Sequence, residues 1–266
     1  MKRYLFFTAT IALALALTAA NNHLRGPWFI AAAFALLAVW LTVVTLGVTF
    51  LSLCFFVDAV TRLDTDERVI ALTYDDGPDP QATRALLDLL DELSVQAAFF
   101  CIGEKVRAHP DVAREIVKRG HLLAMHGERH HWRSAFRLGA FWRRDIRACR
   151  DAIVEATGRT PALYRPPFGF TNPHLPGVLR RAGWTCVGWT IRSLDGVNLS
   201  IDRVVRRVTQ RLRPGAIVLL HDGGREPQRV LTITRRIVQA ARESGYRCVR
   251  LDAAPPVERG EKPQVI

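Results

Sequence analysis

The stretch VIALTYDDGP, residues 69–78, decides how the rest of the chain is interpreted. It opens with an apolar run of strand length, and the run ends in two aspartates and a Gly-Pro turn. A short apolar run bounded by turn residues is typical of a buried strand. Six further runs of this kind follow, at residues 97–102, 121–125, 162–164, 185–191, 216–220 and 246–251.

Amphipathic stretches lie between these runs. In each of them the apolar residues recur every three or four positions, which predicts a helix. The stretches are residues 83–93, 111–119, 145–157, 176–182, 201–212 and 230–243. Strands that alternate with helices form a parallel sheet, either open and doubly wound or closed into a barrel, so the predicted fold class is α/β. In both architectures ligands bind at the carboxyl ends of the strands.

Acids, histidines and an arginine follow the predicted strands, one strand after another. This pattern indicates a single polar site at one rim of the sheet. The residues concerned are Asp75, Asp76, His126, His130, Arg165, Asp195 and His221.

Three of these residues suit a metal ion. One carboxylate and two imidazoles form a ligand set that leaves positions open for water and substrate. Asp76, His126 and His130 can supply that set, and the spacing of four residues favours His130 over the adjacent His131. Asp75 is then free to act as a base on a metal-activated water.

Three others suit the hydrolysis of an amide. Arg165 can keep a neighbouring carboxylate ionised and oriented. His221 can give a proton to the leaving nitrogen, and Asp195 can hold the imidazole protonated and aimed.

Together these residues resemble the five ordered motifs of the polysaccharide deacetylases, which are chitooligosaccharide-deacetylase-like carbohydrate esterases. The motifs are residues 74–78, His126 with His130, residues 165–169, Trp189 with Asp195, and residues 219–221. The resemblance covers residues 69–252. It implies a distorted seven-stranded (β/α) barrel and a divalent metal, most commonly Zn²⁺, although Co²⁺, Ni²⁺ and Mn²⁺ also suit these ligands.

The resemblance also implies roles for individual residues. Asp75 is the general base, held by Arg165, and His221 is the acid, supported by Asp195. The metal ligands are Asp76, His126 and His130. The residues that line the substrate site are Pro167, Phe168 with its backbone N–H in the oxyanion hole, Gly169, Trp189 and Leu219.

Four positions depart from the family pattern. Gly127 stands where Ser or Thr is common, Arg192 where an acid often appears, Gly196 where Trp is common, and Phe168 where Tyr is commoner. No catalytic group is lost. The departures indicate a substrate unlike plain chitin or peptidoglycan.

The N-terminus predicts a membrane anchor at residues 1–60, ahead of a catalytic domain at residues 61–252 and a disordered tail at residues 253–266. Residues 27–57 carry no charge and are long enough to span a bilayer as a helix. The apolar residues 4–20 are a short span or a signal peptide. Lys2, Arg3, Arg62 and Arg68 favour a catalytic domain on the cytoplasmic side of a bacterial inner membrane.

The net charge of +12 fits anionic lipid headgroups. Nucleic acid is not expected as a partner, because the chain has no zinc-finger spacing and no RNA-binding strand signature. Five scattered cysteines do not indicate a disulfide framework. Residues 132–142 mix aromatic residues with arginines, which suits a membrane interface, a phosphate-bearing headgroup, or an amphipathic helix packed on the barrel.

The leading hypothesis is a metal-dependent hydrolase that removes an acetyl or formyl group from a lipid-linked amino sugar. In outline it resembles the membrane-associated deformylase of aminoarabinose-lipid synthesis, which belongs to the same superfamily. One alternative is an N- or O-deacetylase of peptidoglycan or an exported polysaccharide. An alternative of another class is an inactive barrel that serves as a sugar-binding or scaffold protein.

Overall fold

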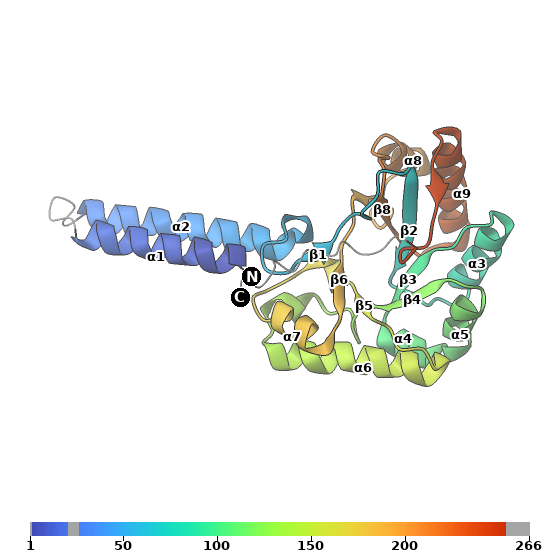
Figure 1. Ribbon diagram of the computed structural model, residues 1–266, viewed down its shortest axis with the longest axis horizontal. Helices are drawn as coiled ribbons and strands as arrows, with labels where there is room; N and C mark the ends of the chain where they lie inside the picture. The colour runs from blue at the N-terminus through green and yellow to red at the C-terminus, as the bar shows by residue number, and fades with distance from the viewer. Residues whose placement is uncertain (1, 21–26, 254–266) are drawn as a thin grey trace, which may run out of the picture.

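The computed structural model describes residues 2–20 and 27–253 as an N-terminal helical hairpin followed by an α/β domain (Figure 1). Of the tail predicted to be disordered, all but Ala253 lies outside the described residues.

The hairpin consists of α1 (Lys2–Ala20) and α2 (Pro27–Thr49), which lie side by side and extend from the domain (Figure 1). The indole N–H of Trp40 donates to the hydroxyl of Thr8 at 3.3 Å. Residues 28–49 are long and apolar enough to cross a membrane, and the apolar part of α1 is shorter. This hairpin suggests a signal or a membrane anchor. α2 ends eight residues before the predicted limit of 57, because Phe56 and Val57 are buried in the domain and the chain turns through η1 (Leu51–Leu53).

The end of α2 is hydrogen-bonded directly to the domain. The backbone N–H of the buried Thr171 donates to the carbonyl of Val48 at 3.0 Å, and its hydroxyl donates to the carbonyl of Gly47 at 3.2 Å. Tyr4 of α1 packs against the ring of Phe56, with 5.1 Å between the ring centroids. The hairpin is therefore packed onto the domain rather than joined to it by a free linker.

Nine strands of the described chain form one sheet, and every pairing between strands is parallel. The order is β1-β6-β5-β4-β3-β2-β8-β7, with β9 beside the first residues of β2. The strands are β1 (Ala59–Val60), β2 (Val69–Asp75), β3 (Ala98–Cys101), β4 (Leu122–Met125), β5 (Leu163–Tyr164), β6 (Thr185–Val187), β7 (Ile191–Arg192), β8 (Ala216–His221) and β9 (Arg247–Cys248).

Helices cover the outer face of this sheet (Figure 1). Six of them match the predicted amphipathic stretches, and α4 follows β3 without having been predicted. They are α3 (Ala82–Glu92), α4 (Gly103–Ala108), α5 (Pro110–Lys118), α6 (Gly139–Thr157), α7 (Leu175–Ala182), α8 (Ile201–Thr209) and α9 (Pro227–Glu243), with 3-10 turns η2 (Trp132–Phe136) and η3 (Pro167–Gly169).

The sheet curls into the distorted barrel that the resemblance implied. It has two strands more than the seven expected. One is β1, which lies in the region assigned to the anchor. The other arises because residues 185–191 form two strands at opposite ends of the sheet. The N–H of Gly188 donates to the carbonyl of Val60 in β1, and the N–H of Thr190 donates to the carbonyl of Ile217 in β8. The three residues between β6 and β7 therefore connect the two ends of the curled sheet.

The two faces of β2 explain why its sequence forms the central strand. Ile70, Leu72 and Tyr74 point outward into the main core under the helices. Val69 and Ala71 point inward and belong to a second, smaller apolar cluster inside the barrel. Successive side chains of a strand alternate between faces, so Thr73 and Asp75 continue the inward row toward the carboxyl end. The interior thus changes from apolar to polar along one strand.

The aromatic segment 132–142 divides between surface and core. Trp132, Phe136 and Leu138 are 53%, 79% and 67% exposed. Trp142 is fully buried in α6, and its indole N–H donates to Asn172 at 3.2 Å. The packed helix is therefore confirmed from residue 139 onward, and the residues before it are exposed, which leaves the membrane interface and the headgroup site as predictions.

We expect the two tryptophans to respond differently to truncation. Trp142→Ala should lower the free energy of unfolding by about 3–5 kcal/mol, because it empties a buried ring site. Trp132→Ala should change it by less than about 0.5 kcal/mol, because that ring is largely in solvent. Urea unfolding of the two purified variants measures the difference, and equal losses would contradict the division.

Candidate active site

The predicted site residues meet at the carboxyl end of the barrel. Asp75 ends β2 and His221 ends β8, and the two residues are paired in register across these strands. His126 directly follows β4, and Arg165 directly follows β5. Parallel strands bring these four positions to one rim.

A buried ion pair occupies the floor of the site. Arg165 is fully buried, and its Nη1 donates to Asp75 Oδ1 at 2.6 Å and to the hydroxyl of Thr73 at 2.9 Å. Its Nη2 donates to the carbonyl of Gly188 at 2.8 Å. The guanidinium carbon lies 4.0 Å from the centre of the Phe100 ring. Asp75 is therefore held through one oxygen, and its other oxygen faces His126, with 3.7 Å between Asp75 Oδ2 and His126 Nε2.

The three predicted metal ligands converge. One ligand atom from each of Asp76, His126 and His130 lies within 4.8 Å of the other two. Asp76 Oδ1 is 3.1 Å from His130 Nε2 and 3.5 Å from His126 Nε2, yet it is buried and forms no hydrogen bond among the described residues. Asp76 and His130 both have positive φ, 73° and 46°, so the backbone bends at each to bring the side chains together. The rival His131 is exposed, and its ring accepts a hydrogen bond from the N–H of Arg133 instead.

The surroundings orient His126 and shift the pKa values of Asp76 and His130. His126 Nδ1 lies 2.8 Å from the carbonyl of Arg165 and donates to it, which leaves Nε2 to face Asp76. Burial would raise the pKa of Asp76, but the two imidazoles outweigh it and hold the pKa below the ordinary value. Burial and the neighbouring His126 lower the pKa of His130 to about 4. An ionised carboxylate beside neutral imidazole is the form in which these residues bind a cation.

His221 is paired with Asp195. His221 Nδ1 lies 2.8 Å from Asp195 Oδ1, and the backbone N–H of His221 donates to Asp195 Oδ2 at 2.9 Å. Ser193 also donates to Asp195, at 2.7 Å. Burial would lower the pKa of His221, but the hydrogen bond and charge of Asp195 outweigh it and raise the pKa. The imidazole therefore keeps its proton to a higher pH than a free histidine.

The residues predicted to line the substrate site surround this centre. The Phe168 ring lies 4.4 Å from the His130 ring, and φ at Phe168 is 59°. The backbone N–H of Phe168 forms no hydrogen bond to any residue that the structure describes. Trp189 packs directly over Gly169, where a Cβ would lie 2.5 Å from the indole. Pro167 and Leu219 are buried beside them.

Sequence reasoning missed two residues that support the site. Thr73 bonds to Arg165, and its place two residues before Asp75 on an alternating strand is the signal that could have revealed it. Ser193 bonds to Asp195, and nothing in the local pattern distinguishes it from an ordinary loop serine.

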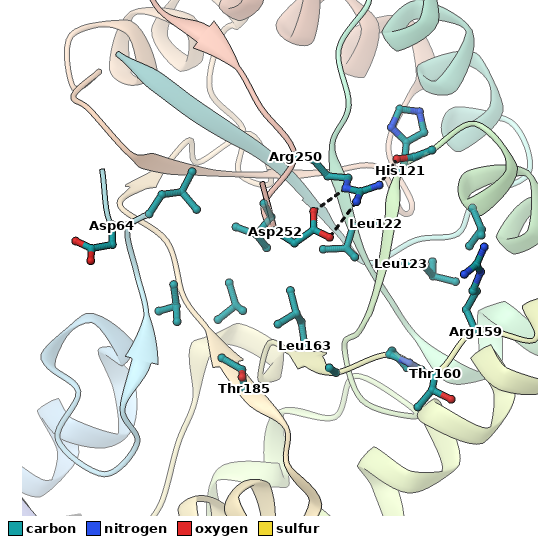
Figure 2. A pocket seen from close by; sticks show the side chains of 18 of the residues that line it. Asp64, His121, Leu122, Leu123, Arg159, Thr160, Leu163, Thr185, Arg250 and Asp252 are labelled. Atoms are coloured by element: carbon teal, nitrogen blue, oxygen red, sulfur yellow. Dashed lines mark hydrogen bonds and ion pairs between the residues drawn. The ribbon is translucent and has the colours of Figure 1, made fainter. Parts of the chain in front are cut away.

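A cavity of about 650 Å³ lies at the opposite end of the barrel, near the first residues of the strands (Figure 2). Leu122 and Leu163 line it, and Arg250 pairs with Asp252 at 2.6 Å. None of the site residues predicted from the sequence is among those that line this cavity. It is separate from the centre described above.

Residues 62–187 match the family model described as polysaccharide deacetylase. A peptidoglycan-N-acetylglucosamine deacetylase from Bacillus cereus is 31% identical over 195 residues, which cover 71% of this chain and 88% of that protein. A chitooligosaccharide deacetylase from Rhizobium leguminosarum bv. trifolii is 38% identical over 159 residues, which cover 60% of this chain and 74% of that protein. The solved structure of a family 4 carbohydrate esterase from Streptomyces lividans is 33% identical, with a TM-score of 0.63 over 68% of this chain and 92% of that one.

The sequence matches, the curled parallel barrel and the Asp-His-His cluster at its rim agree with one another. The chain belongs to the polysaccharide deacetylase family, and it is a carbohydrate deacetylase, a hydrolase that acts on linear amides.

Proposed function

We propose that this enzyme removes an acetyl or formyl group from a lipid-linked amino sugar at the cytoplasmic face of the membrane. In this proposal residues 1–60 anchor the protein and residues 61–252 carry the chemistry. The observation that carries it is the pair of hydrogen bonds from Thr171 to the end of α2, because Thr171 lies only three residues beyond Phe168. The mouth of the site is thereby next to the anchor.

Asp76, His126 and His130 are the residues that would hold a divalent ion. The donor set fits, since one buried carboxylate oxygen without a hydrogen bond lies between two imidazole nitrogens. Zn²⁺ is the ion that this set suits best, with Co²⁺, Ni²⁺ and Mn²⁺ as alternatives. When bound, the ion supplies Lewis acidity to the acyl carbonyl and lowers the pKa of water.

The remaining residues move and hold protons. Asp75 takes the proton of the attacking water through Oδ2, because Arg165 already engages Oδ1. His221 gives its proton to the leaving nitrogen through Nε2, because Nδ1 is engaged by Asp195. The free N–H of Phe168 donates to the developing oxyanion. Trp189 and Leu219 enclose the small acyl group.

The cytoplasmic orientation is supported by the hairpin. If both helices cross the bilayer, the N-terminus and the catalytic domain lie on the same side. Lys2 and Arg3 are the first residues of α1, and Arg62 and Arg68 follow α2, so four positive charges are on that side against Arg25 alone between the two helices in the sequence. Such an excess is typical of the cytoplasmic side.

An exposed apolar lip supports the proposal that the substrate is lipid-linked. We define the lip as Trp132, Phe136 and Leu138, which are all largely exposed. Asn172 ties this segment to the anchor-binding loop, since its Nδ2 donates to the carbonyls of Ala135 and Arg137 at 3.0 and 2.8 Å. The lip leads into the N-terminal end of α6, which packs against α7 on the side from which the hairpin extends (Figure 1). Exposed aromatic residues beside arginines suit the headgroup region of a membrane.

A second candidate function is deacetylation of peptidoglycan or another exported polysaccharide. The names of the curated relatives favour it. It requires the catalytic domain on the outer side of the membrane, so the location of the domain separates the two.

Replacing the ligands should separate metal binding from chemistry. His130→Ala should lose bound zinc and activity together, because one of the three metal ligands is removed. Asp75→Asn should keep zinc and lose activity by about 100-fold or more, because the base is removed. His131→Ala is the matched control and should keep both. Metal content and hydrolysis of an acetylated chromogenic sugar measure this, and full activity in Asp75→Asn would refute the assigned base.

The pH profile should reveal the acid. Asp195 raises the pKa of His221 by favouring its charged form. Asp195→Asn should therefore lower that pKa, so His221 loses its proton at lower pH and the alkaline limb of the kcat/KM profile moves to lower pH. Profiles of both proteins with zinc at saturation measure the shift, and an unmoved alkaline limb would remove His221 from this role.

Cells that carry Asp76→Ala in place of the wild type should accumulate an acylated, lipid-linked amino sugar. The reason is that the anchor confines the enzyme to membrane substrates. Mass spectrometry of extracted lipids measures the accumulation, and a wild-type copy should reverse it. A phosphatase fused to the C-terminus should be silent in these cells, whereas an active fusion with acetylated wall polymer accumulating would favour the second candidate.

A further inference from the structure

Arg225 lies at the rim of the site beside the acid His221. It follows β8 in the loop His221-Asp222-Gly223-Gly224-Arg225. Gly223 packs so closely on Asp76 that a Cβ there would lie 1.9 Å from the Asp76 carbonyl oxygen. The loop therefore wraps the turn that carries a predicted metal ligand.

The absence of a side chain at Gly196 makes room for this arginine. A Cβ on Gly196 would lie 3.0 Å from Arg225 Nη2 and 3.7 Å from His221 Cε1. The guanidinium of Arg225 and the imidazole of His221 therefore both lie next to Gly196. Asp195, which orients the imidazole, is the residue immediately before it.

Arg225 has no counter-ion within the described residues. Its Nε is buried without a hydrogen-bond partner, and its side chain forms no ion pair with the residues that the structure describes. Each nearby carboxylate accepts hydrogen bonds from other groups, although Oδ1 of Asp222 is buried without one. Asp195 bonds to His221 and Ser193, and Glu226 caps α9 by accepting from the N–H groups of Gln228 and Arg229. Asp222 accepts from Thr83.

A buried and unpaired guanidinium N–H costs free energy, whereas a solvated surface arginine avoids this cost. Arg225 is only partly exposed. The planar fork of a guanidinium matches the oxygens of a phosphate with two parallel hydrogen bonds. The neighbouring Arg229 cannot share that task in the same way, because its Nη2 donates to the carbonyl of Leu199 at 2.7 Å.

We propose that Arg225, in the space left by Gly196, is a subsite for a phosphate group carried by the amino sugar whose amide is cleaved. The inference rests on the proposed function and names the chemistry by which the site distinguishes its substrate from a neutral polysaccharide. The phosphate lies on the leaving-group side, because Arg225 adjoins the acid and not the Phe168 loop. Arg225 is a specificity residue in this scheme and takes no part in proton transfer.

The test compares three substrates that differ only in one group. They are the methyl glycoside of N-acetylglucosamine, N-acetylglucosamine 1-phosphate, and the glycoside of N-acetylglucosamine that carries a carboxylate in place of the phosphate. The full-length, zinc-loaded protein in detergent is used throughout. The measured quantity is the ratio of kcat/KM for each charged substrate to that for the neutral one.

In Arg225→Gln the phosphate ratio should fall about tenfold, which corresponds to about 1.4 kcal/mol. Arg225→Lys should retain part of the ratio, because the charge remains but the fork is lost. Arg206→Gln is the matched control, since Arg206 is an exposed arginine on α8, and its ratio should equal that of the wild type.

An unchanged phosphate ratio in Arg225→Gln overturns the proposal. A change in the carboxylate ratio without a change in the phosphate ratio also overturns it. Zinc content and near-ultraviolet circular dichroism show whether each variant is folded. If the wild type cleaves none of the three substrates, the proposed function itself fails. If it cleaves them and the ratios ignore Arg225, only this subsite fails.

Discussion

The site depends on the buried pair of Arg165 and Asp75. Arg165 has no contact with solvent. Its guanidinium donates hydrogen bonds to Asp75 of β2 and to the carbonyl of Gly188, and it packs against the Phe100 ring. A buried charge is tolerated only when its partner and its remaining hydrogen bonds are in place, and removing one partner of such a pair costs about 3–5 kcal/mol. The same guanidinium therefore stabilises the barrel interior and aims the carboxylate proposed as the base.

The sequence predicted the elements whose signal is local. Short apolar runs that end in polar residues revealed the strands, and the residues at their ends indicated the site, because parallel strands share one rim. Three features had no such signal. Residues 185–191 form one apolar run in the sequence, but the structure divides this run into β6 and β7. The division depends on hydrogen bonds to the distant residues Val60 and Ile217, which the local sequence does not reveal. The short α4 has too few residues to show a helical period, and β1 is continuous in composition with the anchor.

The supporting residues were harder to predict than the principal ones. Asp76 and His130 could be named from type and spacing, but their positive φ values could not. Ser193 and Arg225 have ordinary local sequences, and what distinguishes them is contact with Asp195 and Gly196 across the fold. Long-range contacts of this kind appear only once the tertiary structure is known.

The hydrogen bonds between Thr171 and the end of α2 limit the distance between the catalytic centre and the helical hairpin. No slack chain separates the helix from the loop of Phe168, so in a membrane the catalytic centre would stand at a fixed height above the lipid surface. A sugar carried on a lipid moves in the same thin layer, where confinement raises its effective concentration at the mouth. If the hairpin anchors the protein as proposed, a polymer strand farther from the bilayer would lie beyond that layer, and the short connection would select substrates by their distance from the lipid.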